Sequence, residues 1–276
     1  MTKPVIHTRI KKVLDSGILD TDDILATEEP LEIKLIFGPT HNRRQQNITV
    51  TMRTPGNDED LAAGFLFSEG IISSYDAISQ VKASESRDGS VMTVSLKENV
   101  IPRLSSNNRN FAATASCGVC GKSDLADIHT GVSVANGNAH ISSATVLQLP
   151  QTLRMQQSLF ESTGGIHAAA LFDQQGKLLI LQEDIGRHNA VDKIIGAALR
   201  QGLFPLEQQL LLLSGRAGFE LIQKAAMAGI TIIAAVGAPS SMAVQMAAAW
   251  NITLIGFLRE GKFNIYSGAQ RVVLSS

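Results

Sequence analysis

Apolar and polar residues alternate in the first third of the chain, most clearly in the run ITVTMR at residues 48–53, a pattern typical of a half-buried strand. The pattern predicts strands at residues 31–37, 48–53, 78–83 and 91–96 and a helix at residues 61–68. Asn57 or Asp58 is expected to cap this helix, and Gly70 to end it. These elements predict a small α+β unit, preceded by roughly thirty polar residues that indicate an arm.

From residue 140 onward the pattern changes, and short apolar runs alternate with helical segments of about ten residues. Strands are expected at residues 167–172, 177–182, 209–213, 231–236, 252–257 and 263–266, and helices at residues 150–160, 189–199, 219–228 and 242–250. The first two strands are expected to form a hairpin through a turn at residues 173–176. The first of these helices is expected to start at Pro150, because proline suits the first helical turn. The alternation predicts βαβ units and an α/β fold with a parallel sheet covered on both faces.

A stretch rich in Ser, Asn, Gly and Ala separates the two patterns, and long irregular stretches of this kind are usually functional or disordered. We therefore expect a small α+β N-terminal domain at residues 1–110 and an α/β domain at residues 140–276. A mobile segment at residues 111–139, which carries both cysteines of the chain, is expected to join them.

Charge and hydropathy narrow the class of protein. The net charge is −1 over 276 residues, so neither a nucleic acid nor an anionic membrane is indicated as a partner. The apolar runs are too short to span a bilayer, and the N-terminus lacks the apolar stretch of a secretory signal. We therefore expect a cytoplasmic protein, in whose reducing surroundings two cysteines are more often chemical than structural.

The pair Cys117 and Cys120 is the sharpest chemical feature. Glycines follow both cysteines, which leaves the sulfurs accessible, and Lys122 would lower the pKa of a neighbouring thiol. The second thiol can then resolve a disulfide or persulfide formed on the first. A zinc site is the alternative, and it would have to recruit histidines from elsewhere. The candidates are His129, His140, His167 and His188.

Two polar clusters accompany predicted strand ends. His167 opens a strand after two glycines, where it could act as a base or simply be a core histidine bonded to backbone. The run at residues 183–193 holds six ionisable residues around a strand-to-helix turn. Arg187 and His188 could bind an anion at the helix start, unless Asp184 merely holds Arg187 on a capped helix.

In parallel sheets ligands bind beyond the carboxyl ends of the strands, which directs attention to two further loops. Ser214 and Arg216 lie between a strand and a helix, as in a phosphate cradle or an ordinary tight turn. The segment GFLREGK at residues 256–262 offers an aromatic ring and two cations beside glycines. This segment could bind a purine nucleotide by stacking and charge, or it could simply be a solvated charged loop.

Taken in order, these segments resemble the FdhD family, the formate dehydrogenase accessory sulfurtransferases. The matching segments are AAGFLFSEGI (62–71), SCGVCG (116–121), TGGIHAA (163–169), EDIGRHNAVDK (183–193), SGR (214–216) and GFLREGK (256–262). Each segment alone is weakly specific, but the ordered set over roughly residues 30–270 is specific.

The resemblance implies an enzyme that accepts sulfur from a cysteine desulfurase as a cysteine persulfide. The sulfur would pass to the molybdenum (or tungsten) bis-guanine-dinucleotide cofactor needed by formate dehydrogenase, and guanine nucleotides would mimic that cofactor. Cys117 is then the persulfide carrier and Cys120 its helper. The family's fold implies a cytidine-deaminase-like three-layer domain at residues 140–276, and a homodimer. The family's nucleotide-contacting segment falls on Phe257, Leu258, Arg259, Glu260, Gly261 and Lys262.

Three other functions compete with this one. A zinc deaminase would need a glutamate two residues after its histidine, and Ala169 stands there after His167. A non-enzymatic chaperone would bind the same cofactor through residues 257–262 and keep its thiols structural. A zinc-stapled module would use the thiols as ligands, whereas we expect no metal.

Overall fold

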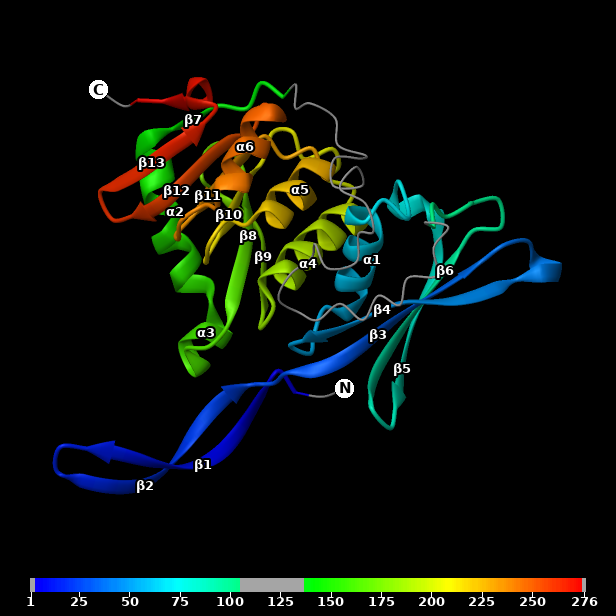
Figure 1. The fold of residues 1–276 in the computed structure, drawn as a ribbon, viewed down its shortest axis with the longest axis horizontal. Coiled ribbons are helices and arrows are strands. Elements are labelled where there is room, and N and C mark those ends of the chain that lie inside the picture. Colours follow the sequence, from blue (N-terminus) through cyan, green and yellow to red (C-terminus); the bar gives the residue numbers. More distant parts are fainter. Residues whose placement is uncertain (1–2, 105–136, 275–276) are drawn as a thin grey trace.

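The structure, a computed structural model, describes residues 3–104 and 137–274. These residues form a mixed α/β fold in which a large sheet flanked by helices lies beside a smaller sheet (Figure 1). A two-stranded hairpin, β1 (Val5–Leu14) and β2 (Gly17–Ala26), projects from the body at the lower left of Figure 1, below α3 (Ser158–Thr163). None of the helices in the described ranges is long and apolar enough to cross a membrane.

The smaller sheet contains the four strands expected in the first third of the chain. Within the described residues its order is β4-β3-β6-β5, with β3 and β6 parallel and the other neighbours antiparallel. The strands are β3 (Glu29–Phe37), β4 (Arg44–Arg53), β5 (Ile78–Ser86) and β6 (Gly89–Leu96). Helix α1 (Asp58–Ser68) packs on β6, and three acidic residues in its first turn suit the positive end of the helix dipole.

The large sheet is mixed rather than parallel. In the described part of the chain its order is β13-β12-β11-β10-β8-β9, and only β10, β11 and β12 run parallel. The strands are β8 (His167–Phe172), β9 (Leu178–Asp184), β10 (Leu210–Leu213), β11 (Ile232–Ala235), β12 (Thr253–Arg259) and β13 (Lys262–Ser267). The expectation of a parallel sheet is wrong at both edges, because a hairpin reverses the strand direction. The β8–β9 hairpin confirms the hairpin expected there, while the β12–β13 hairpin was not expected.

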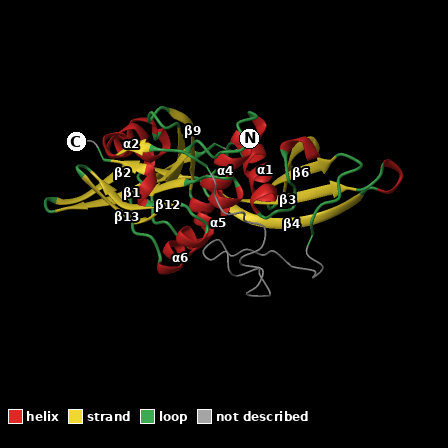
Figure 2. Cartoon of the chain, turned by 90° about the horizontal axis from the view of Figure 1, so that it is seen from above, coloured by secondary structure: helices red, strands yellow, loops and turns green. Residues whose placement is uncertain are grey.

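Helices cover both faces of the large sheet, as expected (Figure 2). They are α2 (Ser143–Gln156), α4 (Arg187–Arg200), α5 (Phe219–Met227) and α6 (Ser241–Ala249). Strand β10 shows the division between the faces: Leu210 and Leu212 join the cluster under α2, while Leu211 joins the cluster under α4 and α5. A short parallel pair, β7 (Ile141–Ser142) and β14 (Val272–Val273), flanks α2.

The first helix of the second unit does not start at Pro150. It starts at Ser143, because the side chain of Ser142 accepts a hydrogen bond from the backbone N–H of Thr145 (3.0 Å) and so caps the helix. Pro150 lies inside the helix, where its missing N–H leaves one carbonyl without its helical partner. The chain then bends at Gln157 into a separate short helix, α3 (Ser158–Thr163), so the predicted single helix is two.

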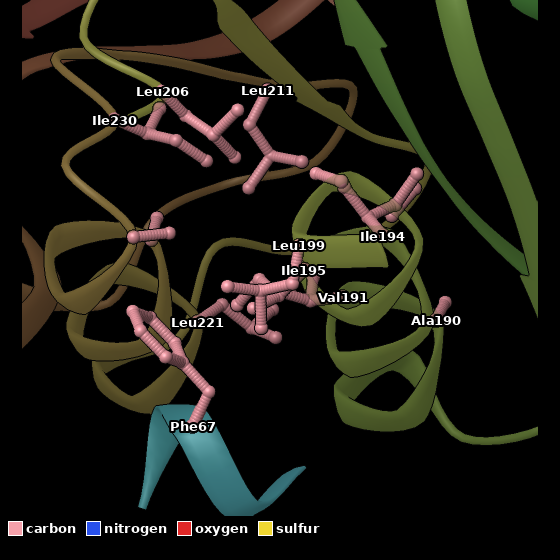
Figure 3. Packing of buried hydrophobic residues seen from close by; sticks show 14 of the residues in the cluster. Phe67, Ala190, Val191, Ile194, Ile195, Leu199, Leu206, Leu211, Leu221 and Ile230 are labelled. Carbon is pink, nitrogen blue, oxygen red and sulfur yellow. The ribbon is translucent and has the colours of Figure 1, made fainter. Parts of the chain in front are cut away.

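Helices α1 and α4 cross in backbone contact and so join the smaller sheet to the larger one. A Cβ atom added at Gly64 would lie 1.9 Å from the carbonyl oxygen of Asp192, and one added at Gly196 would lie 1.9 Å from that of Asp60. One hydrophobic cluster runs through the crossing, and Figure 3 shows Phe67 of α1 lying against residues of α4 and α5. The two expected units therefore share a core, and the domain boundaries stay a prediction.

Candidate functional site

Loops that are far apart in the sequence meet at one edge of the large sheet. Strand β10 ends there and the antiparallel strand β8 begins there, joined by hydrogen bonds from the N–H of Ala168 to Ser214 Oγ (2.8 Å) and from the N–H of Ser214 to the carbonyl of Ala168 (3.0 Å). The N–H of Gly237 donates to Gly215 (3.0 Å), and the N–H of Phe257 donates to Gly237 (3.0 Å). The expected gathering of strand-end loops is therefore present.

A cavity of about 570 Å³ opens at this edge. His167, Ser214 and Gly215 form one side, and residues of α2 and α3 form the other. His167 lies against the glycine, since a Cβ added at Gly215 would be 3.3 Å from His167 Nδ1. The cavity thus offers an imidazole and a hydroxyl at the carboxyl end of a strand, where α/β proteins bind their ligands.

His167 is held in its neutral form. Burial lowers its pKa below the usual 6.5, and the charges of Arg187 and His188 lower it further, with Asp184 opposing. Its ring makes no hydrogen bond to any residue in the described ranges, so the backbone-bonded core histidine is not what the structure contains. A neutral imidazole at the cavity wall can accept a proton or donate a hydrogen bond to a ligand.

The α2–α3 wall of this cavity was missed by the sequence analysis. The guanidinium carbon of Arg154 lies 4.2 Å from the centre of the Phe160 ring, and both residues line the cavity. Gln157 also lines it, is only 5% exposed, and has a buried amide nitrogen without a hydrogen-bond partner in the described structure. The sequence did contain one signal for this wall. Val146, Leu149 and Leu153 form a buried stripe at helical spacing, and the next position of that stripe is the polar residue Gln157.

Several ionisable residues in the run at 183–193 serve the fold. The Glu183 carboxylate accepts hydrogen bonds from the N–H groups of Leu159 (3.1 Å) and Phe160 (2.9 Å) at the start of α3. Asp184 forms its ion pair with Lys193, at 2.7 Å, rather than with Arg187. The alternative that Asp184 merely holds Arg187 is therefore wrong. These pairings fix the floor and wall of the cavity.

The two anion candidates of this run differ in their surroundings. His188 Nε2 lies 2.9 Å from the carboxylate of Glu220, which occupies one ring nitrogen. Arg187 is half-buried at the first position of α4, next to the free N–H groups of the helix start, and makes no ion pair with a described residue. Arg187 is therefore the better anion ligand of the two.

The segment AAGFLFSEGI has a structural role that its sequence did not reveal. Besides the helix crossing at Gly64, it supplies Ser68, which donates to the Asp192 carboxylate at 2.7 Å. Lys224 of α5 lies 2.9 Å from the same carboxylate and donates to Ser68 at 2.8 Å. This buried network ties α1, α4 and α5 together.

The segment at residues 257–262 is a hairpin rather than a loop. Strand β12 extends to Arg259, and the turn at Glu260 and Gly261 leads directly into β13, with Gly261 in the left-handed region (φ 74°). The Phe257 ring is exposed, and the guanidinium carbon of Arg259 lies 5.8 Å from its centre. Leu258 is fully buried in the core, so it can position this segment but cannot touch a ligand.

The remaining expected site residues take different places. Arg216 is exposed, one residue beyond the cavity wall at Gly215, and Lys262 is exposed at the start of β13. Cys117 and Cys120 lie outside the described residues, so their position relative to the cavity stays a prediction. Among the residues that the structure describes, no group of three or more His, Cys, Asp or Glu side chains is placed to hold a metal.

Comparison with known proteins identifies the family. The FdhD/NarQ family matches residues 26–273. This chain belongs to that family. A relative from Streptomyces avermitilis, sulfur carrier protein FdhD, is 42% identical over 275 residues, covering 96% of this chain and 95% of its own. The protein of the same name from Mycolicibacterium paratuberculosis is 46% identical over 258 residues, covering 91% of this chain and 92% of its own.

A solved structure supports the fold of this family member. The crystal structure of a formate dehydrogenase accessory protein from Desulfotalea psychrophila matches with a TM-score of 0.76 at 23% identity. The match covers 98% of this chain and 100% of that one. This structure thus shares the mixed α/β architecture of the chain. The predicted family resemblance is confirmed by the family match and the sequence relatives.

Proposed function

We propose that this protein is a sulfurtransferase that takes sulfur from a cysteine desulfurase and passes it to the molybdenum bis-guanine-dinucleotide cofactor used by formate dehydrogenase. The observation that carries the proposal is the cavity at the strand ends, where neutral His167 and Ser214 lie at the sheet edge that also holds the cationic hairpin at residues 257–262. Its relatives are named sulfur carrier proteins, and its structural neighbour is a formate dehydrogenase accessory protein.

In this proposal the thiol pair Cys117 and Cys120 carries out the sulfur transfer. The Cys117 thiolate attacks the outer sulfur of the desulfurase persulfide, so that the sulfur–sulfur bond of the donor breaks and the donor leaves as a thiolate. Cys120 then attacks the Cys117 sulfur, a disulfide forms, and the carried sulfur leaves as hydrosulfide for the acceptor. A thiol reductant must restore the dithiol before the next cycle.

The acceptor cofactor is the substrate of this reaction, and the sheet edge is suited to it. The exposed Phe257 ring can stack on a guanine, while Arg259 and Lys262 can pair with phosphates. Further candidates at the edge for phosphate contacts are Ser214, Arg216, Arg187 and His188. The proposal also includes the cytidine-deaminase-like layering, a homodimer and a cytoplasmic location.

The proposal is tested by intact mass spectrometry after incubation with a cysteine desulfurase and cysteine. We expect a gain of one sulfur atom that a thiol reductant removes. A protein that gains no sulfur, in a preparation whose thiols are free and whose desulfurase is active, would be a cofactor chaperone or a zinc module instead.

Removing either hairpin cation is expected to weaken the binding of guanosine diphosphate. In Arg259→Ala and in Lys262→Ala the dissociation constant should rise roughly tenfold, because each charge–phosphate contact is lost. Isothermal titration calorimetry measures it, with Lys177→Ala, an exposed lysine on the β8–β9 turn, as the control. Unchanged affinity in both variants would move the nucleotide site toward Arg187 or Arg216.

Gln157→Met separates a ligand-binding role from a structural one. Because the buried amide nitrogen has no partner in the described structure, replacing it by an apolar side chain of similar shape should stabilise the fold by about 1 kcal/mol. If the amide instead bonds the ligand, nucleotide affinity should fall in the same variant. Thermal unfolding and calorimetry measure the two effects, and lower stability with unchanged affinity would contradict the assignment.

A further inference from the structure

One wall of the cavity at the strand ends consists of residues that contact no assigned part of the substrate in the proposed function. Arg154 of α2 and Phe160 of α3 form this wall, and the guanidinium lies over the aromatic ring, 4.2 Å from its centre. Gly215 lies on the other side of the cavity, where it presents backbone instead of a side chain. We call the space between this wall and Gly215 the α2–α3 slot.

A buried hydrogen-bond donor at this wall has no partner. Gln157 lines the cavity and is 5% exposed, and its amide nitrogen makes no hydrogen bond within the described structure. Native proteins rarely leave such a group unpaired, because burial removes its hydrogen bonds to water. The amide nitrogen therefore points to a ligand that offers an acceptor, such as a carbonyl oxygen.

The charges around the slot favour an uncharged ligand group. None of the described lining residues is a carboxylate, and the one cation among them, Arg154, lies over the Phe160 ring. His167 is neutral, because burial and then the charges of Arg187 and His188 lower its pKa. A polar ring without charge suits these surroundings better than a phosphate or an ammonium group. The cavity volume of about 570 Å³ is typical of a small-molecule site.

The slot and the cationic hairpin at residues 257–262 lie on the same sheet edge. Strands β10, β11 and β12 are neighbours, and the N–H groups of Gly237 and Phe257 link their ends at 3.0 Å each. Two strand spacings, roughly 10 Å, therefore separate Phe257 from Gly215 along the edge. Within the described sheet only β13 lies beyond β12, so a long ligand with one end at Phe257 extends toward the slot.

We propose that the α2–α3 slot binds a pterin ring of the cofactor whose guanine lies on Phe257. This assignment rests on the proposed function. In the cofactor a ribose and a pyrophosphate separate each guanine from its pterin, and the glycine loops at Gly237 and Gly215 give them room along the edge. The pterin is an uncharged bicyclic ring, and its 4-oxo group is the acceptor that the Gln157 amide lacks. Phe160 and Arg154 offer the surface on which the ring stacks.

Two pteridines that differ in one group test the hydrogen bond. The first, 6-hydroxymethylpterin, carries the 4-oxo acceptor, whereas 2-amino-6-hydroxymethylpteridine has hydrogen in its place. The wild-type chain should bind the first roughly tenfold more tightly, because the second leaves the Gln157 amide unpaired. Fluorescence titration of each pteridine measures the dissociation constants. Equal affinity for the two, or no binding of either, would overturn the proposal.

Gln157→Met completes the comparison. The variant should bind both pteridines with equal affinity, because it lacks the donor that distinguishes them. A preference for the 4-oxo compound that persists in the variant would show that another group contacts this oxygen, contrary to the proposal. Guanosine diphosphate contains no pterin, so its affinity reports on Gln157 only if a guanine enters the slot, whereas the pteridines report on the pterin directly.

A second set of variants separates the slot from the nucleotide segment. Arg154→Ala should raise the dissociation constant of 6-hydroxymethylpterin roughly tenfold, because the ring loses part of its stacking surface. Arg259→Ala should leave this constant unchanged, since Arg259 belongs to the guanine end. Met155→Ala is the matched control, because Met155 is 69% exposed on the same helix and does not line the slot.

Guanosine is the competing occupant, because guanine carries the same oxo and amino groups as a pterin. We expect an equimolar amount of guanosine to leave most of the 6-hydroxymethylpterin bound. Displacement of half of the pterin or more would identify the slot as a guanine site and overturn its assignment to the pterin.

Failure of this assignment can be distinguished from failure of the proposed function. Sulfur loading takes place on the thiols, so Gln157→Met and Arg154→Ala should gain sulfur from the desulfurase as the wild type does. A wild type that loads sulfur but binds no pteridine would refute the slot alone. A wild type that binds the pterin but gains no sulfur would refute only the sulfurtransferase proposal.

Discussion

Replacing Cys117 by Ala is expected to abolish sulfur loading and, with it, the activation of formate dehydrogenase. The carried sulfur forms its covalent bond to this thiolate, and alanine offers no nucleophile that could replace it. The loss should therefore be complete rather than graded. Intact mass after incubation with desulfurase and cysteine checks the loading, and formate oxidation in a strain carrying the variant checks the activation.

Cys120→Ala is the matched control within the same motif. If Cys120 resolves the persulfide, this variant should still gain one sulfur atom but release it slowly. Sulfur loading should then be kept while the activation of formate dehydrogenase falls. Guanosine diphosphate binding should be unchanged in both variants, because the proposed nucleotide residues lie in other segments. Full activation of formate dehydrogenase by Cys117→Ala would instead identify a cofactor chaperone whose thiols are structural.

The sequence predicted the elements of the second unit well because their signals are local. The four-leucine strand β10 and the glycine-bounded helix α5 both lie within one or two residues of their expected bounds. The β8–β9 hairpin was predicted from its turn at residues 173–176, whereas the β12–β13 hairpin was missed, because strand direction depends on turn length and not on hydropathy. The early start of α2 was missed because Pro150 was taken as the first-turn residue of the helix. The actual N-cap is Ser142, two turns upstream.

The candidate site could be predicted only as a set of residues. The strand-end rule placed Ser214 and the segment at residues 257–262 at one sheet edge, whereas His167 reaches that edge only because β8 runs antiparallel to β10. For the opposite wall of the cavity the helical spacing of Gln157 was a weak signal, and it did not show that the wall faces this edge. Nor could it separate the roles within the run at residues 183–193. Burial and distance do so: Asp184 is fully buried against Lys193, whereas Arg187 is half-buried beside the helix start.

Lys193→Met is expected to destabilise the protein by about 3–5 kcal/mol, because it leaves the Asp184 carboxylate buried without its cation. Both residues are at most 1% exposed, and Lys193 Nζ lies 2.7 Å from Asp184 Oδ2. The same ammonium donates to the carbonyl of Thr54 at 2.9 Å, so the lysine also ties the end of β4 to α4. Chemical denaturation measures the loss, with the exposed Lys177→Ala as the control.

The double variant Lys193→Met with Asp184→Asn distinguishes a lost ion pair from lost packing. Removing both charges should recover part of the stability, since no buried carboxylate then remains unpaired, although the amide must still accept from Gly186. A double variant as unstable as the sum of the two single ones would show that the pair acts through packing alone.

The position of this ion pair gives it a functional consequence. Asp184 is in register with His167 across β8 and β9, and the next residue, Ile185, lines the cavity, so the pair supports the cavity from behind. A variant at Lys193 should therefore lose formate dehydrogenase activation in proportion to its unfolded fraction, and its folded fraction should still bind nucleotide. Arg187→Ala should instead keep the stability of the wild type and bind the nucleotide more weakly. The two residues lie in one short run of sequence, yet we expect one to support the site and the other to bind its ligand.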